Sequence, residues 1–154
     1  MLVEGYGVEG AAHAGPFVRH RYLARRQPRL ANLRPHLIPS ELFAFLSDAG
    51  LEVRPGELGE NITTPGLDLE RMPLGTLIEL GPVAIIELTG LRTPCVLIDR
   101  FQAGLKRQVL SLAETGPPFK CGVLRVVRVG GAVAPGHSAR VRLPSSPCRA
   151  LPAL

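Results

Sequence analysis

Apolar residues recur at helical spacing in one segment of the chain. Residues 42–46 contain two leucines and two phenylalanines that would lie on one face of a helix. Ser40 stands before this stripe as a candidate N-cap, and Gly50 follows it as a candidate end. The pattern predicts a helix over residues 40–49, with its apolar stripe in the core.

Most of the remaining apolar pattern has the short period of β-strands. Between two β-branched runs, Gly81-Pro82 outlines a hairpin turn, and a valine-rich run later in the chain ends at Gly130-Gly131. In the second run Ala84, Ile86 and Leu88 would face one side of a sheet. The pattern predicts strands over residues 76–80, 83–88, 122–129 and 132–143, and a short helix within residues 102–112.

Composition supports one domain built mainly from strands. The chain has 154 residues, of which 45% are hydrophobic, and it is rich in turn-forming residues, with 17 glycines and 15 prolines. We therefore expect a mostly β domain, a barrel or sandwich with one or two short helices, over residues 1–143. Residues 144–154 are expected to form a flexible tail.

Positive charge is concentrated in one short segment of the chain. The net charge is +5, and six arginines crowd residues 19–34 with no acid among them. Arginine suits phosphate and carboxylate groups, so this segment is either an anion site or a solvated basic loop. Nucleic acid ranks third, because only 5% of the residues are aromatic and base stacking is poorly supplied.

The three cysteines have no spacing typical of zinc or disulfide frameworks. Cys95, Cys121 and Cys148 include no Cys-x-x-Cys pair, and an odd count without a targeting peptide favours the reducing cytoplasm. The longest apolar run is too short to span a bilayer, so we expect no membrane association. Cys121 and Cys148 are interpreted as a core residue and a tail residue.

Two motifs carry a resemblance to a known family. The first is the glycine-punctuated run 55–64, Pro-Gly-Glu-Leu-Gly-Glu-Asn-Ile-Thr-Thr, and the second is Arg92-Thr93-Pro94-Cys95, expected at the end of a strand. Their order resembles the MOSC domain, the module found at the C-terminus of molybdenum-cofactor sulfurases and as small stand-alone proteins. The resemblance covers about residues 7–143 and implies a β-barrel-like fold.

The resemblance implies that Cys95 is the catalytic residue and the ligand of molybdenum or sulfur. A positive neighbour such as Arg92 favours the thiolate, which is the nucleophile and the soft metal ligand. On residue chemistry alone, the usual interpretation of Cys95 is a small buried hydrophobe rather than a functional thiol. Cofactor-binding candidates implied by the family match are Arg92, Arg34, Asn32, His13, Glu60, Asn61 and Thr63. Without the family, the polar groups of residues 59–63 would simply stabilise a turn.

The resemblance implies binding of the molybdenum cofactor, a pterin-phosphate ligand. The expected chemistry is reduction of N-hydroxylated compounds, or sulfur transfer, with an electron-donor or sulfur-donor protein as partner. The alternatives are a metal-free sulfur carrier and a degenerate binding module, the latter favoured by Ala11 where the family has an acid and by His137. The N-terminal lead-in is shorter than is usual in the family, and an open sheet edge would suit a homodimer.

Overall fold

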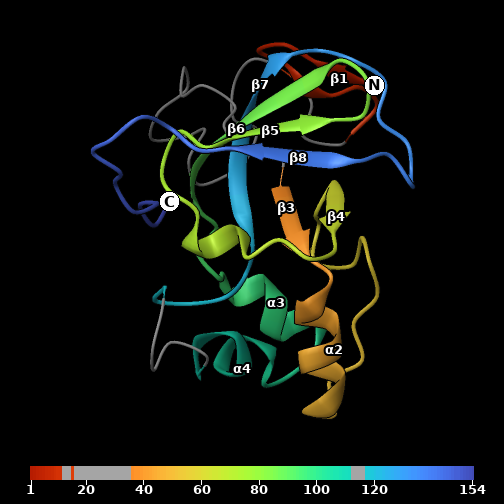
Figure 1. The fold of residues 1–154 in the computed structure, drawn as a ribbon. Helices are drawn as coiled ribbons and strands as arrows, with labels where there is room; N and C mark the ends of the chain where they lie inside the picture. Colours follow the sequence, from red (N-terminus) through yellow and green to blue (C-terminus); the bar gives the residue numbers. More distant parts are fainter. Residues whose placement is uncertain (12–14, 16–35, 112–116) are drawn as a thin grey trace.

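The protein is described by a computed structural model that covers residues 1–11, 15, 36–111 and 117–154. A curled sheet forms one half of the molecule, and three helices lie together below it (Figure 1). The elements are β1 (Leu2–Val3), β2 (Gly7–Val8), β3 (His36–Pro39), α2 (Glu41–Asp48), β4 (Ile62–Thr64), the 3₁₀ helix η1 (Leu69–Arg71), β5 (Leu77–Leu80), β6 (Ala84–Leu91), α3 (Val96–Phe101), α4 (Leu105–Ser111), β7 (Val123–Val129) and β8 (Ala139–Arg142).

The main sheet has six strands in the order β4-β3-β7-β6-β5-β8. Among the strands of the described residues, β3 and β4 pair in parallel, and the other neighbours in this sheet are antiparallel. Register shifts interrupt the β6–β7 pairing between Ile85 and Ile86 and between Leu88 and Gly90, and such irregularities increase local twist and bending. The curled sheet confirms the predicted mostly β, barrel-like fold.

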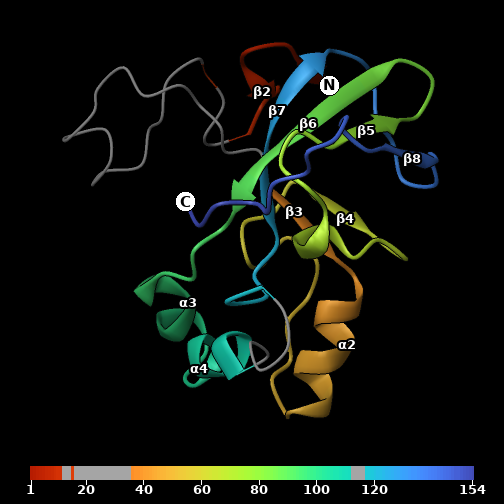
Figure 2. The same cartoon turned by 60° about the vertical axis from the view of Figure 1, so that its left-hand side comes forward.

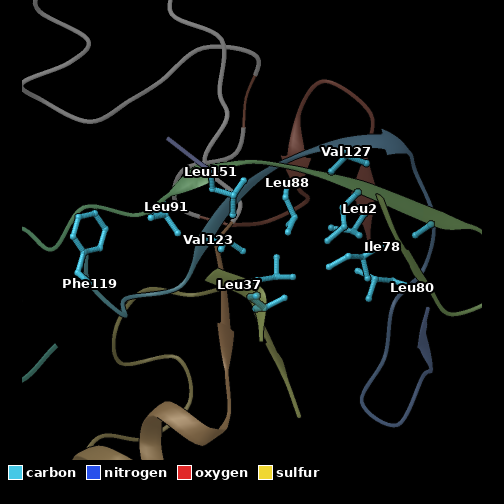
Figure 3. Packing of buried hydrophobic residues seen from close by; sticks show 13 residues of the cluster. Leu2, Leu37, Ile78, Leu80, Leu88, Leu91, Phe119, Val123, Val127 and Leu151 are labelled. Carbon is cyan, nitrogen blue, oxygen red and sulfur yellow. The ribbon is translucent and has the colours of Figure 1, made fainter. Parts of the chain in front are cut away.

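The alternation predicted for the second strand is present in β6. Ala84, Ile86 and Leu88 are buried, while the residues between them are partly exposed. They belong to a cluster that fills the concave side of the sheet beneath β6 and β7 (Figure 3). Each fully buried leucine or isoleucine contributes about 1.5–3 kcal/mol relative to exposure. The strand is longer than the predicted 83–88, because it continues to Leu91.

A second apolar cluster ties the helices to β3. Leu42 and Leu46 of α2 pack with Ile98 of α3, Leu105 of α4 and Ile38 of β3. The predicted helix 40–49 is therefore confirmed as a core element. None of the helices in the described part of the chain combines the length and apolar character that a membrane span requires.

One detail of α2 differs from the sequence prediction. Ser40 precedes the helix but makes no side-chain cap, because its backbone is already helical, with φ −61° and ψ −26°. The carboxylate of Glu41 instead accepts a hydrogen bond from the Gly66 amide at 2.6 Å. Gly50 follows the helix with φ +77°, which is the left-handed ending that its residue type predicts.

The C-terminal segment, predicted as a flexible tail, lies against the end of β6. The Leu91 amide donates to Pro152 O at 2.8 Å, and the Thr93 amide donates to Leu154 O at 3.1 Å. A Cβ on Gly90 would lie 2.6 Å from Leu154 Cγ and 2.8 Å from Pro152 O, so only glycine admits this approach. Figure 2 shows the C-terminus beside the point where β6 leaves the sheet.

Candidate functional site

The Arg-x-x-Cys motif lies where the sheet meets the helices. β6 ends at Leu91, and residues 92–95 connect it to α3. The expectation that Cys95 ends the strand is wrong: Cys95 immediately precedes α3, and its carbonyl accepts from the Ile98 amide at 3.3 Å. Pro94 has no amide hydrogen with which to extend a ladder, which explains why the strand stops earlier.

All three cysteines are free thiols in different environments. Cys95 is half-buried, Cys121 is fully buried and Cys148 is exposed. A half-buried thiol beside a connecting loop is accessible to a ligand while still held by its surroundings. The role of Cys95 as a metal or sulfur ligand stays a prediction.

Arg92 joins the Cys95 segment to the start of β7. Its guanidinium Nη1 donates to Cys121 Sγ at 3.0 Å, and its backbone amide donates to Gly122 O at 3.0 Å. Burial raises the pKa of the Cys121 thiol, and the nearby Arg92 charge opposes this shift. Cys121 therefore stays a neutral thiol that holds Arg92 in place.

His36 is the next buried titratable group at this end of the sheet. Its Nε2 lies 2.8 Å from Cys121 O, and a carbonyl can only accept, so Nε2 carries the proton. Burial, followed by the nearby positive charges of Arg92 and Arg125, lowers the pKa of His36 to about 3. The imidazole is therefore neutral at physiological pH.

Gly122 permits the close approach of β3 and β7. Its φ is +80°, and a Cβ there would lie 2.6 Å from His36 Nε2 and still closer to Leu37 O. The Gly122 amide donates to Glu70 Oε1 at 3.1 Å. Burial raises the pKa of the Glu70 carboxyl, whose Oε2 has no hydrogen-bond partner among the described residues.

Arg125 adds a buried positive charge to the same end of β7. Its side chain is fully buried, and burial lowers its pKa to about 9. Nε, Nη1 and Nη2 all lack a hydrogen-bond partner in the described part of the chain. Burying a cation without hydrogen-bond acceptors lowers stability by several kcal/mol, so an anion bound to Arg125 would be stabilising.

The glycine-punctuated motif is bonded mainly within itself and to β3. Glu60 Oε1 accepts from the Gly56 amide, while Glu60 Oε2 is buried without a partner among the described residues. Asn61 Oδ1 accepts from the His36 amide at 2.9 Å, and the Asn61 amide donates to His36 O at 2.9 Å. Thr63 pairs with Ile38 in the sheet and lines a separate cavity of about 700 Å³.

The predicted site residues are only partly brought together. Arg92 and Cys95 share the loop after β6, and Asn61 approaches that end through His36. His13, Asn32 and Arg34, like the rest of the arginine segment, lie outside the described residues. The roles proposed for Glu60, Asn61 and Thr63 stay predictions.

Sequence reasoning missed four members of the cluster, which are Cys121, His36, Glu70 and Arg125. Three of them are tied in by hydrogen bonds: Arg92 with Cys121, His36 with Cys121, and Glu70 with Gly122. Their contacts join residues that are 29, 85 and 52 positions apart, so no local motif identifies them. Within the described ranges, no three His, Cys, Asp or Glu side chains are grouped to hold a metal ion.

Comparisons with known proteins agree with this architecture. Residues 30–142 match the MOSC domain family. YiiM from Geobacillus stearothermophilus is 22% identical, with a TM-score of 0.60 over 73% of this chain and 56% of that one. YiiM from Escherichia coli is 20% identical, with a TM-score of 0.57 over 77% and 59% of the two chains.

A third solved structure, YuaD from Bacillus subtilis, is 21% identical, with a TM-score of 0.60 over 75% of this chain and 67% of that one. No curated protein sequence matches the chain. The chain thus spans little more than half the length of the two YiiM proteins, and the three structures share its fold. Because the family match covers most of the chain and the fold agrees with it, the protein belongs to the MOSC domain family.

Proposed function

We propose that the protein binds the molybdenum cofactor at the junction of β6, α3 and β7, with the Cys95 thiolate as the ligand of molybdenum or its sulfur. The observation that carries this proposal is the half-buried Cys95 thiol at the end of the Arg92 segment. Thiolate is a soft ligand of the kind that thiophilic metals prefer. Membership of the MOSC domain family supports the choice of the molybdenum cofactor in this proposal.

The charges at this junction fit a cofactor that carries a phosphate. Arg92 is half-buried beside Cys121, and Arg125 is a buried guanidinium with three nitrogens unpartnered within the described ranges. Guanidinium groups bind phosphate oxygens through charge-assisted hydrogen bonds. In this proposal Cys95 holds the metal or sulfur, and the arginines, including Arg34 and its neighbour Asn32, hold the anionic part.

The proposed reaction is reduction of an N-hydroxylated compound. The N–O bond breaks, two electrons and two protons are taken up, and an amine-type N–H and water are produced. Bound molybdenum supplies the redox chemistry, and an electron-donor protein supplies the electrons, because the cofactor rather than side chains carries such steps. The chain's residues bind and orient the cofactor and exclude water from the buried side at Cys121.

The test uses full-length protein purified from a host that makes the cofactor. Molybdenum is measured by elemental mass spectrometry and pterin by fluorescence after oxidative release. We expect near-stoichiometric amounts of both in the wild type and loss of molybdenum in Cys95→Ser. Cys148→Ser, which changes an exposed thiol, serves as the matched control and should keep the wild-type content. Equal molybdenum in both variants would remove Cys95 from the proposal.

A metal-free sulfur carrier is the second candidate, favoured by the half-buried Cys95 thiol, which is accessible to a sulfur donor without any metal. Mass spectrometry of protein incubated with a sulfur donor would then show one added sulfur atom on Cys95. Sulfur on Cys95 with neither molybdenum nor pterin would favour the carrier over the cofactor-binding protein.

A further inference from the structure

A second cavity is lined by residues of α2, by the segment that leads into η1, and by Lys120 just before β7. Its volume is about 460 Å³, which is within the range of small-molecule sites. Leu42, Phe45 and Leu67 supply most of its apolar wall. Glu70 and Lys120 also line the cavity.

Glu70 is a buried acidic residue in the lining of this cavity. Its side chain is only 4% exposed, and Oε1 already accepts from the Gly122 amide at 3.1 Å. Oε2 is buried and has no hydrogen-bond partner in the described part of the chain. A buried carboxyl oxygen without a donor is costly, so a ligand that brings an N–H group would be stabilised here.

The remaining charges at the cavity favour a cation over an anion. Glu41 and Asp68 line it together with Glu70, against the single positive charge of Lys120. Glu41 is engaged by the Gly66 amide at 2.6 Å, and Asp68 pairs with Arg71 at 3.6 Å. The Arg71 charge offsets that of Asp68, so the net negative charge of the lining comes from Glu41 and Glu70 against Lys120, and Glu70 Oε2 is the acceptor without a partner among the described residues.

We propose that this cavity binds a small organic cation, an ammonium or amidinium group on a compact apolar body, with its N–H donor on Glu70 Oε2 and its body against Leu42, Phe45 and Leu67. The proposal goes beyond cofactor binding, because the apolar wall comes from α2 and Leu67, and Glu70 is the residue that the cavity shares with the candidate-site cluster. Glu70 also accepts a hydrogen bond from the Gly122 amide, next to Cys121. A ligand bound to Glu70 would therefore perturb the proposed cofactor site through this hydrogen bond.

The test compares three probes that share a benzyl-type body and differ in charge: benzylamine, benzyl alcohol and benzoate. Binding to cofactor-free, full-length protein is measured by titration of backbone amide NMR shifts at neutral pH. Benzylamine should bind at least tenfold more tightly than benzoate, with the largest shifts at residues of α2, η1 and Gly122. The titration uses cofactor-free protein, so a failure of benzylamine to bind says nothing about the cofactor proposal, which is tested separately by the molybdenum content.

Variants assign the effect to the proposed group. Glu70→Gln should remove the preference for benzylamine while benzyl alcohol still binds, which shows that the cavity remains folded. Glu52→Gln, which changes an exposed acid outside the cavity, is the matched control and should leave the preference unchanged. Lys120→Gln should tighten benzylamine binding.

Two results would overturn the proposal. The first is tighter binding of benzoate than of benzylamine, lost in Lys120→Gln, which would make the cavity an anion site. The second is the absence of shifts at the cavity with all three probes at millimolar concentration.

Discussion

The two motifs that mark this chain behave differently in the folded protein. In the glycine-punctuated motif, Glu60 Oε1 and Asn61 Oδ1 accept from the backbone amides of Gly56 and His36 and so serve the turn, and Glu60 Oε2 is the acceptor left without a partner among the described residues. At the Arg-x-x-Cys motif, Cys95 is half-buried, Arg92 donates to a second thiol, and unsatisfied charges lie nearby. Polar residues alone do not mark a site; what matters is whether the fold has already satisfied them.

The largest expected effect contrasts a glycine from each region. Gly122 and Gly59 have nearly equal φ angles, +80° and +77°, but only Gly122 is surrounded by backbone and side-chain atoms. Gly122→Ala should lower the free energy of unfolding by more than about 3 kcal/mol, because strain and steric overlap add. Gly59→Ala should lower it by only about 1–2 kcal/mol. Denaturant unfolding measures both, and equal losses would contradict the crowding inferred at Gly122.

The second effect concerns the buried guanidinium. Arg125→Met should raise the unfolding free energy of cofactor-free protein by about 1–4 kcal/mol, because an unpaired buried charge is replaced by an apolar chain. The same variant should hold less molybdenum, since a proposed phosphate contact is lost.

The matched control for this prediction is Arg128→Met, which removes an exposed ion pair to Glu87 at 2.6 Å. It should change stability by less than about 1 kcal/mol. A destabilised Arg125→Met protein would show that the guanidinium has partners that compensate its burial.

The pH dependence of stability is the third test. His36 has a folded pKa of about 3, far below the ordinary histidine pKa of 6.5, so between these two pH values the unfolded chain binds the extra proton. Stability should therefore fall as the pH is lowered below 6.5, by up to about 1.4 kcal/mol per pH unit from this group. Glu70 acts in the opposite direction, because its raised pKa makes stability fall as the pH rises above its ordinary value.

Variants separate the two contributions. His36→Gln keeps a donor for Cys121 O and should flatten the acid limb of the stability profile, whereas His137→Gln, at an exposed position, should leave the limb unchanged. Urea unfolding between pH 4 and 7 gives the profile, with the range chosen around the histidine reference value of about 6.5. An unchanged limb in His36→Gln would show that His36 titrates normally.

The smallest effect concerns Cys121. Cys121→Ala should lower the unfolding free energy by about 1–2 kcal/mol, because it removes packed volume and the acceptor for Arg92 Nη1. Cys148→Ala removes an exposed thiol and should change stability by less than about 0.5 kcal/mol. Thermal unfolding compares the two, and an equal small change would place Cys121 outside the tightly packed part of the protein.

Sequence patterns predicted the fold well where periodicity was strong. The apolar stripe of residues 42–46 and the alternation of Ala84, Ile86 and Leu88 reflect local geometry, and both appear in the structure. The sequence pattern did not predict the correct end of β6, because the C-terminal segment that pairs with Leu91 is remote in sequence.

The candidate site was predictable only as far as its motifs are contiguous. Arg92 and Cys95 stand three residues apart and are recognisable together. The contact of Arg92 with Cys121 and that of Glu70 with Gly122 depend on how separate strands meet. Whether a polar atom such as Glu70 Oε2 is left without a partner follows from packing, which no residue pattern records.

The measurement that tests the central claim most directly is protection of the three thiols from alkylation. Protein loaded with cofactor and protein stripped of it are treated with iodoacetamide, and each cysteine is quantified by peptide mass spectrometry. We predict that loading protects Cys95, leaves exposed Cys148 reactive, and leaves buried Cys121 slow to react in both forms. Rapid alkylation of Cys95 in protein that retains its molybdenum would contradict the assignment of Cys95 as the ligand.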